Sequence, residues 1–189
     1  MEKAFREFIA QINEGIPLSK AFLEQLKNHI RLLEYQKNDT WLVKGTSSRE
    51  VLYIQHGSAM SYRQTEAHQW ITSLWTTNEM IIQGSSLLPR PDPKDRIVFL
   101  EASTVLAINI EKAQTLQIAH PSAIQLINRI LIKSLQRLED QYRLMHFQPP
   151  KTRLHHTQQH YKKTFHLLTS EQKASYLGIS RPTLYRLLH

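Results

Sequence analysis

The sequence predicts an α+β protein in which a β-rich region lies between helical segments. Residues 32–110 consist of short β-prone runs separated by turn residues, and residues 122–147 contain no glycine or proline that would break a helix. The runs recur about every 8–12 residues, a spacing typical of an antiparallel sandwich or barrel-like roll rather than of a parallel sheet with crossover helices. A basic segment after residue 146 indicates a small separate module.

The composition is that of an ordinary globular protein. The 189 residues are 41% hydrophobic and 21% charged, which suffices for one core with a small additional module. No apolar run reaches the ~18–20 residues of a membrane span, and the N-terminal stretch has acidic residues but no apolar h-region, unlike a secretory signal. The chain has no cysteine, which excludes disulfides and cysteine-held metal clusters. We therefore expect a cytoplasmic protein without a membrane partner.

The net charge of +8 is unevenly distributed along the chain. Residues 1–146 contain 17 basic and 15 acidic residues, whereas residues 147–189 contain seven basic residues and one acidic residue, Glu171. The same segment contains His155, His156, His160 and His166. A basic module on a nearly neutral body favours an anionic polymer or surface as the partner. A solvated, frayed tail is the alternative.

The N-terminal half is predicted to contain two helices and then a series of strands. The helices are expected at residues 2–14 and 19–30, and Ser19 can cap the second one. The β-prone runs that follow are LLEYQ, TWLVK, VLYIQ, SAMSYR, QWITSLW, MIIQ, RIVFLE and VLAINI. Gly45, Gly57, Gly84 and the loop at 89–93 mark turns between them.

After Pro121 the chain is predicted to form one long helix with a single apolar stripe. The stripe consists of Ile124, Ile127, Leu131, Leu135, Leu138, Tyr142 and Met145, spaced by three or four residues. Because a small roll cannot cover so long a stripe, we expect its first six residues to pair with a second copy, forming a homodimer. Packing of the stripe on the roll is the alternative, since Ser134 and Gln141 interrupt any strict heptad. The sequence at 148–150, Gln-Pro-Pro, is expected to end the helix as a stiff hinge.

The segment TSEQKASYLGISRPTLYRLLH has the pattern of a helix-turn-helix. Thr169 or Ser170 can cap a first helix that ends near Leu177. Gly178 suits a left-handed turn, and Ser180 can cap a second helix that begins with Arg and Pro. Small and apolar residues are placed to hold the two helices together: Ala174, Ile179, Leu184 and Leu187.

The second helix of this motif presents side chains that can contact double-stranded DNA. They are Ser180, Arg181, Thr183, Tyr185 and Arg186, which can reach phosphates and base edges in a major groove. Lys162 and Lys163 lie on a helix expected at 152–167 and are placed to contact phosphates. A generic helical hairpin is the alternative interpretation.

The stretch KGTSSREVLYIQHGSAMSYR resembles the signature of the CRP/FNR superfamily of bacterial transcription regulators. The matching positions are Gly45, Leu52, Tyr53, Ile54, Gly57 and Ser58. The resemblance covers essentially the whole chain. It implies a cyclic-nucleotide-binding-like antiparallel β-roll of the double-stranded β-helix, jelly-roll-like kind at 1–120, a dimerisation helix at 121–147 and a helix-turn-helix domain at 148–189. It also implies a homodimer that places one helix per protomer in a DNA half-site, with RNA polymerase as a further partner.

The segment QGSSLLPRPDPKDRIVFLE departs from the pattern of family members that bind cyclic nucleotides. Those members typically have Gly-Glu-Leu and, further on, Arg-Ser or Arg-Thr, which bind the ribose and the phosphate. Here two serines follow the glycine, and Asp95 stands where a small hydroxyl residue is expected, which would repel a phosphate. We expect weak or no binding of cyclic AMP. Another small anionic effector is the alternative, held by Gly84, Ser85, Ser86, Lys94 and Arg96.

Other chemistry is not favoured by the sequence. His155, His156 and His160 could place two imidazoles on one helical face, but no carboxylate or cysteine nearby in the sequence completes a metal site. The chain has neither a nucleophile elbow nor a glycine-rich phosphate loop, so we do not expect an enzyme. The predicted function is a DNA-binding transcription regulator with an unidentified effector. A ligand-sensing or protein-interaction module with a degenerate DNA-binding tail is the alternative.

Overall fold

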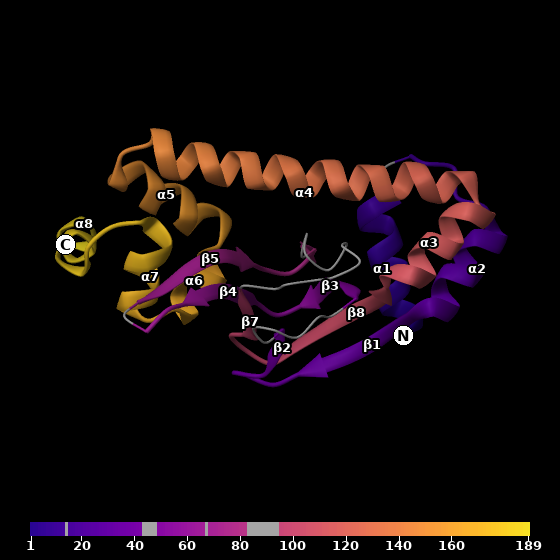
Figure 1. Ribbon diagram of the computed structural model, residues 1–189, viewed down its shortest axis with the longest axis horizontal. Helices are drawn as coiled ribbons and strands as arrows, with labels where there is room; N and C mark the ends of the chain where they lie inside the picture. Colours follow the sequence, from indigo (N-terminus) through magenta and orange to yellow (C-terminus); the bar gives the residue numbers. More distant parts are fainter. Residues whose placement is uncertain (14, 43–48, 67, 83–94) are drawn as a thin grey trace.

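Two antiparallel sheets of four strands each form the centre of the computed structural model (Figure 1). The structure describes residues 1–13, 15–42, 49–66, 68–82 and 95–189. The first sheet has the order β1 (Ile30–Tyr35), β8 (Ser103–Asn109), β3 (Glu50–His56) and β6 (Met80–Ile81). The second has the order β2 (Thr40–Leu42), β7 (Arg96–Phe99), β4 (Ala59–Gln64) and β5 (Gln69–Trp75), so β5 is an edge strand.

Successive side chains of the first sheet point to opposite faces, so this sheet contributes to two separate hydrophobic cores. On β3, Leu52 and Ile54 are fully buried among residues of both sheets, whereas Tyr53 between them packs with the N-terminal helices. Gly57 then turns the chain with φ +114, and a Cβ at this position would lie 2.8 Å from the Cα of Ser103. Only glycine fits there, because the backbones approach closely and φ is positive. The predicted roll and its Gly-Ser turn are confirmed.

Three helices and the start of a fourth cover the outer face of the first sheet (Figure 1). They are α1 (Glu2–Asn13), α2 (Lys20–His29), α3 (Ile110–Ala119) and α4 (Pro121–Phe147). The first two agree with the expected ranges to within one residue, and Ser19 accepts the Phe22 N–H at 3.1 Å as the expected cap. Helix α3 was not expected, although Asn109 caps it by accepting the N–H groups of Glu111 and Lys112.

Helix α4 runs unbroken along the molecule as expected, and it divides into two faces. One face turns to the body and buries Ala123, Leu126 and Leu144. A neighbouring face exposes large apolar side chains. Five residues of the expected stripe are 41–58% exposed, namely Ile124, Leu131, Leu135, Leu138 and Tyr142. We call these five residues the α4 stripe. Packing on the body, the alternative noted above, accounts for only part of the expected stripe, because Ile127 and Met145 are half-buried whereas the five residues of the α4 stripe are exposed.

Four short helices complete the chain: α5 (Pro150–His160), α6 (Lys162–Leu167), α7 (Ser170–Leu177) and α8 (Arg181–Leu188). We call residues 148–189 the helical module. The expectation of one helix over 152–167 was wrong, because Tyr161 has a non-helical conformation that separates α5 from α6. Its hydroxyl donates to Glu79 of the roll at 3.4 Å, so a tertiary contact overrides the local helical pattern. None of the described helices combines the length and the apolar character that a membrane crossing requires.

Candidate nucleic-acid interface

Helices α7 and α8 form a helix-turn-helix whose turn is fixed by short-range hydrogen bonds. Thr169 caps α7 in a reciprocal capping box with Gln172, with N–O distances of 3.2 and 2.9 Å. Gly178 has φ +62 and ψ 40, the left-handed conformation that ends a helix, and the following N–H of Ile179 donates to the Ala174 carbonyl at 3.0 Å. The turn therefore forms where the sequence predicts it.

Buried side chains hold the two helices of the motif against each other. Ala174, Leu177 and Leu184 are at most 3% exposed, and the small Ala174 side chain lies where the helices approach. Leu184 is the one buried residue of α8, so most of that helix faces outward. Figure 1 shows α8 at one tip of the molecule, at the end remote from α1–α3.

The residues predicted to contact DNA lie together on and beside the exposed part of α8. Arg181, Tyr185 and Arg186 are exposed. The hydroxyls of Ser180 and Thr183 are 2.8 Å apart, and the Arg186 guanidinium donates to Thr183 at 3.3 Å. Ser180 also accepts the Thr183 N–H as the helix cap. These residues form a continuous polar surface that includes two arginine side chains. The guanidinium group of arginine is the side-chain group best suited to bind phosphates and guanine edges.

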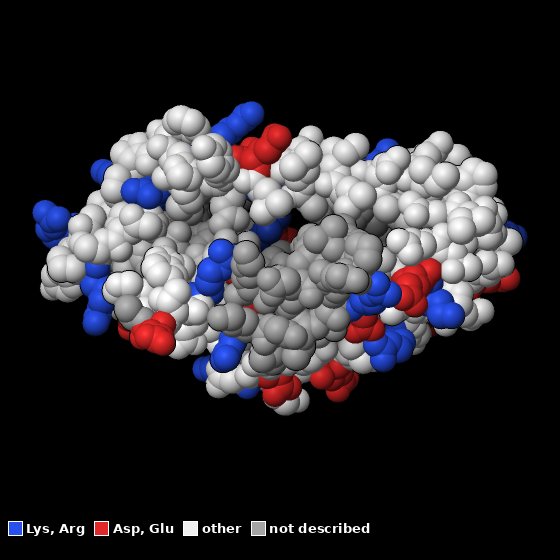
Figure 2. All heavy atoms as spheres, in the orientation of Figure 1, with Lys and Arg blue, Asp and Glu red and all other residues white. Residues whose placement is uncertain are grey.

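The charge around this surface is predominantly positive. Figure 2 shows Lys and Arg side chains around the end formed by α5–α8, whereas basic and acidic side chains are mixed at the opposite end. The helical module contains seven of the 24 basic residues and one of the 16 acidic residues. Such an imbalance attracts polyanions over a distance of about one Debye length.

The helical module packs directly on the second sheet through a shared apolar core. The sheet contributes Met60, Ile71, Leu74 and Leu100, and the module contributes Leu154, Phe165, Leu168, Ala174, Tyr176, Leu177 and Leu184. The pKa of the Tyr176 phenol is strongly raised by burial and next by the nearby Tyr161. The module is thus held in one orientation relative to the roll.

Helix α7 covers part of the free edge of β5 through a single side chain. The Ser175 hydroxyl accepts the Ile71 N–H at 3.0 Å and donates to the Gln69 carbonyl at 3.0 Å. An edge strand leaves backbone N–H and C=O groups unpaired, and the Ser175 hydroxyl here pairs with one N–H and one C=O of β5. Sequence reasoning did not identify Ser175, because its partners lie 104 and 106 residues away.

A second link is a chain of polar groups from α6 to the roll. Thr164 donates to Ser58 at 3.0 Å, and Ser58 donates to Glu101 at 2.8 Å, with both hydroxyl residues fully buried. Glu101 also pairs with Lys163 at 2.9 Å. Burial would raise the pKa of the Glu101 carboxyl, but the hydrogen bonds from Lys163 and Ser58 outweigh it, and the pKa is lowered.

The two lysines expected to contact phosphates therefore differ. Lys162 is exposed, whereas the ammonium of Lys163 is paired with Glu101 of the roll. A phosphate contact from Lys163 requires this ion pair to open. Because its side chain remains 60% exposed, the pair is a weak one that a phosphate can compete for.

The residues expected to hold a small anion lie mostly outside the described residues. Gly84, Ser85, Ser86 and Lys94 are among those not described. Arg96 lies on β7 with an exposed side chain. The neighbouring Asp95 pairs with Arg63 at 2.8 Å and accepts from Thr72 at 3.0 Å, so its carboxylate is engaged within the second sheet.

The histidines of α5 form a stacked pair. The rings of His156 and His160 are 4.1 Å apart and nearly parallel. The pKa of His156 is lowered by burial and next by the neighbouring His160. In the part of the chain that the structure describes, no group of three or more His, Cys, Asp or Glu side chains is arranged to hold a metal ion.

No protein-family model and no curated protein matches this chain, but solved structures do. FixK2 from Bradyrhizobium japonicum has a TM-score of 0.68 at 13% identity, covering 84% of this chain and 82% of that chain. The c-di-GMP-responsive global regulator CLP from Xanthomonas campestris has a TM-score of 0.67 at 15% identity, covering 90% of each chain. A candidate transcriptional regulator of the CRP/FNR family from Eubacterium rectale has a TM-score of 0.68 at 13% identity, and the match covers 90% of this chain and 82% of that chain. The likeness shows the fold and confirms the order of roll, long helix and helix-turn-helix.

Proposed function

We propose that this chain, which has the CRP/FNR-type fold, is a homodimeric transcription regulator that binds double-stranded DNA through α8. The observation that carries the proposal is the exposed face of α8, where Arg181 and Arg186 lie beside Ser180, Thr183 and Tyr185 at the basic end of the molecule. Arginine forks can bind guanine edges in the major groove, with phosphate contacts from neighbouring lysines fixing the register. A regulator of this kind acts in the cytoplasm, with RNA polymerase as a further partner, and is not an enzyme.

The exposure of the α4 stripe supports the proposed homodimer. Five large apolar side chains along one helix face are about half exposed, although that face lies outside the core of its own roll. Pairing of two α4 helices would remove this surface from water and would place two α8 helices on one duplex. The sequence at 84–96 supports an effector other than cyclic AMP, and a small anion bound near Lys94 and Arg96 is our proposal for the roll pocket.

The experiment is a selection of bound duplexes from random DNA, followed by binding measurements with variants at several salt concentrations. Arg181→Ala and Arg186→Ala should lose the preference for the selected site, about 5- to 150-fold for each good base contact, and should keep much of the non-specific binding. Lys162→Ala should weaken all duplexes alike and reduce the salt slope by about 0.9 for one lost phosphate contact.

Arg6→Ala serves as the matched control, because Arg6 is exposed on α1, far from α8. It should change neither specificity nor the salt slope. If the arginine and lysine variants lose specific and non-specific binding in equal proportion, α8 is not the recognition helix. If none of them changes binding, the helical module does not read DNA and acts as an interaction module instead.

A further inference from the structure

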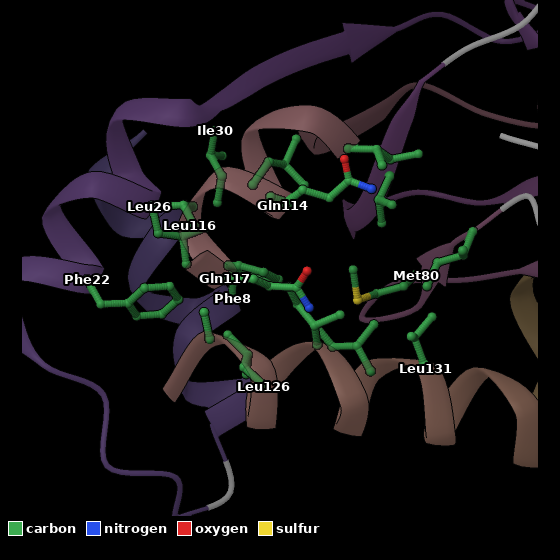
Figure 3. A pocket seen from close by; sticks show the side chains of 18 residues that line it. Phe8, Phe22, Leu26, Ile30, Met80, Gln114, Leu116, Gln117, Leu126 and Leu131 are labelled. Atoms are coloured by element: carbon green, nitrogen blue, oxygen red, sulfur yellow. The ribbon is translucent and has the colours of Figure 1, made fainter. Parts of the chain in front are cut away.

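A cavity of about 250 Å³ lies among the helices that cover the first sheet (Figure 3). Its walls come from α1, α2, α3, the first half of α4, the start of β1 and the outer faces of β3, β6 and β8. Phe8, Phe22 and Leu26 line one end, and Met80 and Leu131 line the other. Of the residues considered above for an anion, Arg96 is the one that the structure describes, and it does not line this cavity.

The walls are apolar except for two carboxamides. Gln114 and Gln117 of α3 are the only polar side chains among the described residues of the lining, and none of the described lining residues is charged. Figure 3 shows both amide groups on the side of the cavity that faces Met80. An ion placed against these walls would lose part of its hydration without gaining a counter-charge, so the walls disfavour anions and cations. The amides can hydrogen-bond to one polar group.

The volume sets the size of an occupant. Protein interiors are close-packed, with few voids larger than a water molecule, so a space of about 250 Å³ is unusual for a packing defect. Buried water needs two to four polar partners per molecule, more than two amides supply for such a volume. An apolar cavity of about 150 Å³ accommodates benzene, and by proportion this one suits about ten non-hydrogen atoms.

We propose that this cavity is a binding site for an uncharged, largely apolar small molecule of about ten non-hydrogen atoms that has one hydrogen-bonding group. The site adjoins the proposed dimer contact, because Leu131 belongs both to the cavity wall and to the α4 stripe. Ile127, half-buried on the same helix, lies in the wall as well. An occupant therefore contacts the helix that we propose to join the two protomers. Binding itself does not depend on the proposed function, whereas this link to the dimer does.

The test uses the full-length protein, three probe molecules and the methyl NMR signals of its methionines. Indole has the expected size and one N–H donor, naphthalene lacks the donor, and indole-3-carboxylate carries a charge. Indole should bind with a dissociation constant on the order of 10–100 µM, and indole-3-carboxylate should bind at least tenfold more weakly. The ring current of bound indole should shift the Met80 methyl signal, whereas Met60, which packs between the roll and the helical module, should not shift.

Two kinds of variant locate the site. Ala113→Phe places a large side chain in the cavity and should abolish binding, and Ala119→Phe makes the same change at an exposed position of α3 outside the lining. Ala119→Phe should bind indole like the unmodified chain. Should Ala113→Phe fail to fold, replacing Gln114 and Gln117 together by Leu provides the second test. This variant should weaken indole about two- to tenfold and leave naphthalene unchanged.

Several results would overturn the proposal. They are a Met80 signal that none of the probes shifts, indole binding that Ala113→Phe retains, and carboxylate binding as tight as that of indole. A Met80 signal that moves with protein concentration in the absence of probe would mean that a second copy of the chain occupies the cavity. None of these measurements uses DNA, so their failure leaves the proposed regulator function untouched, and the reverse also holds.

Discussion

Ser175 offers a direct test of how the helical module is held on the roll. Its hydroxyl makes two hydrogen bonds to the edge of β5, at 3.0 Å each. Ser175→Ala removes both, at about 0.5–1.5 kcal/mol per bond, while alanine improves helix propensity by about 0.5 kcal/mol. The net cost to docking is about 0.5–2.5 kcal/mol.

The assay is amide hydrogen exchange read at single residues by NMR. If docking protects the Ile71 amide, exchange at that position should accelerate by about two- to seventyfold in Ser175→Ala, because a tenfold change corresponds to about 1.4 kcal/mol. The amide of Leu106, on the central strand β8, should exchange as before. Ser170→Ala, an exposed change in the same helix, is the control.

Two results would refute this reasoning. Unchanged exchange at Ile71 would mean that Ser175 does not hold α7 to the strand. Equal acceleration at Ile71 and Leu106 would mean that the variant destabilises the whole protein, so that module and roll do not separate locally.

Three further predictions concern the same framework. Leu131→Lys combined with Leu138→Lys places charges in the α4 stripe and should convert a dimer into monomers in sedimentation; a monomeric unmodified protein at micromolar concentration would contradict it. Lys163 and Ser58 lower the pKa of the Glu101 carboxyl against the effect of burial. The ionised carboxylate therefore stabilises docking of the helical module above about pH 4.3, the ordinary pKa of Glu, and this stabilisation is lost as the pH falls through the lower pKa of the folded protein. The protection factor of the Ile71 amide, which is the ratio of the intrinsic to the observed exchange rate and so removes the pH dependence of intrinsic exchange, should thus fall in acid, and Glu101→Gln should abolish that fall. Gly178→Ala puts a Cβ at φ +62, 3.2 Å from Arg153, and should lower the unfolding free energy by about 1 kcal/mol in denaturant titration; no loss would show that the turn relaxes.

Features that depend on neighbours along the chain were predictable. The capping box at Thr169, the left-handed Gly178 and the unbroken α4 all follow from local patterns, and the structure has them where the sequence places them. Helix α3 was predictable as well, since Asn109 is a good N-cap, but the β-prone run at 105–110 overlaps the start of the helix. The exposed arginines of α8 belong to the same predictable class.

Features that depend on distant contacts were not predictable. The break at Tyr161 coincides with a hydrogen bond to Glu79, 82 residues earlier in the chain, and nothing in the local sequence interrupts the helical pattern. The ion pair of Lys163 with Glu101 could not be predicted either, because the two residues are 62 positions apart in the chain and only the fold brings them together. The lining of the cavity likewise comes from five separate stretches of the chain, at residues 8, 22–30, 51, 80–82 and 108–131, and only the fold brings them together. Sequence patterns therefore predicted the helix-turn-helix and its exposed arginines, but not the contacts that hold the helical module on the roll.

The edge of β5 gives a physical account of how α4 and α7 are coupled. Among the strands that the structure describes, β5 pairs on one side only, and two helices bind the other edge. Ser175 of α7 binds the backbone of its first half, while on α4 Gln141 donates to the Thr72 carbonyl at 2.9 Å and Arg137 donates to the Leu74 carbonyl. Because these backbone groups lie on one continuous strand, we expect a shift of α4 along the roll to move the Gln69 carbonyl and the Ile71 N–H that hold α7. We therefore expect a change at α4 to reach α7 through the backbone of β5.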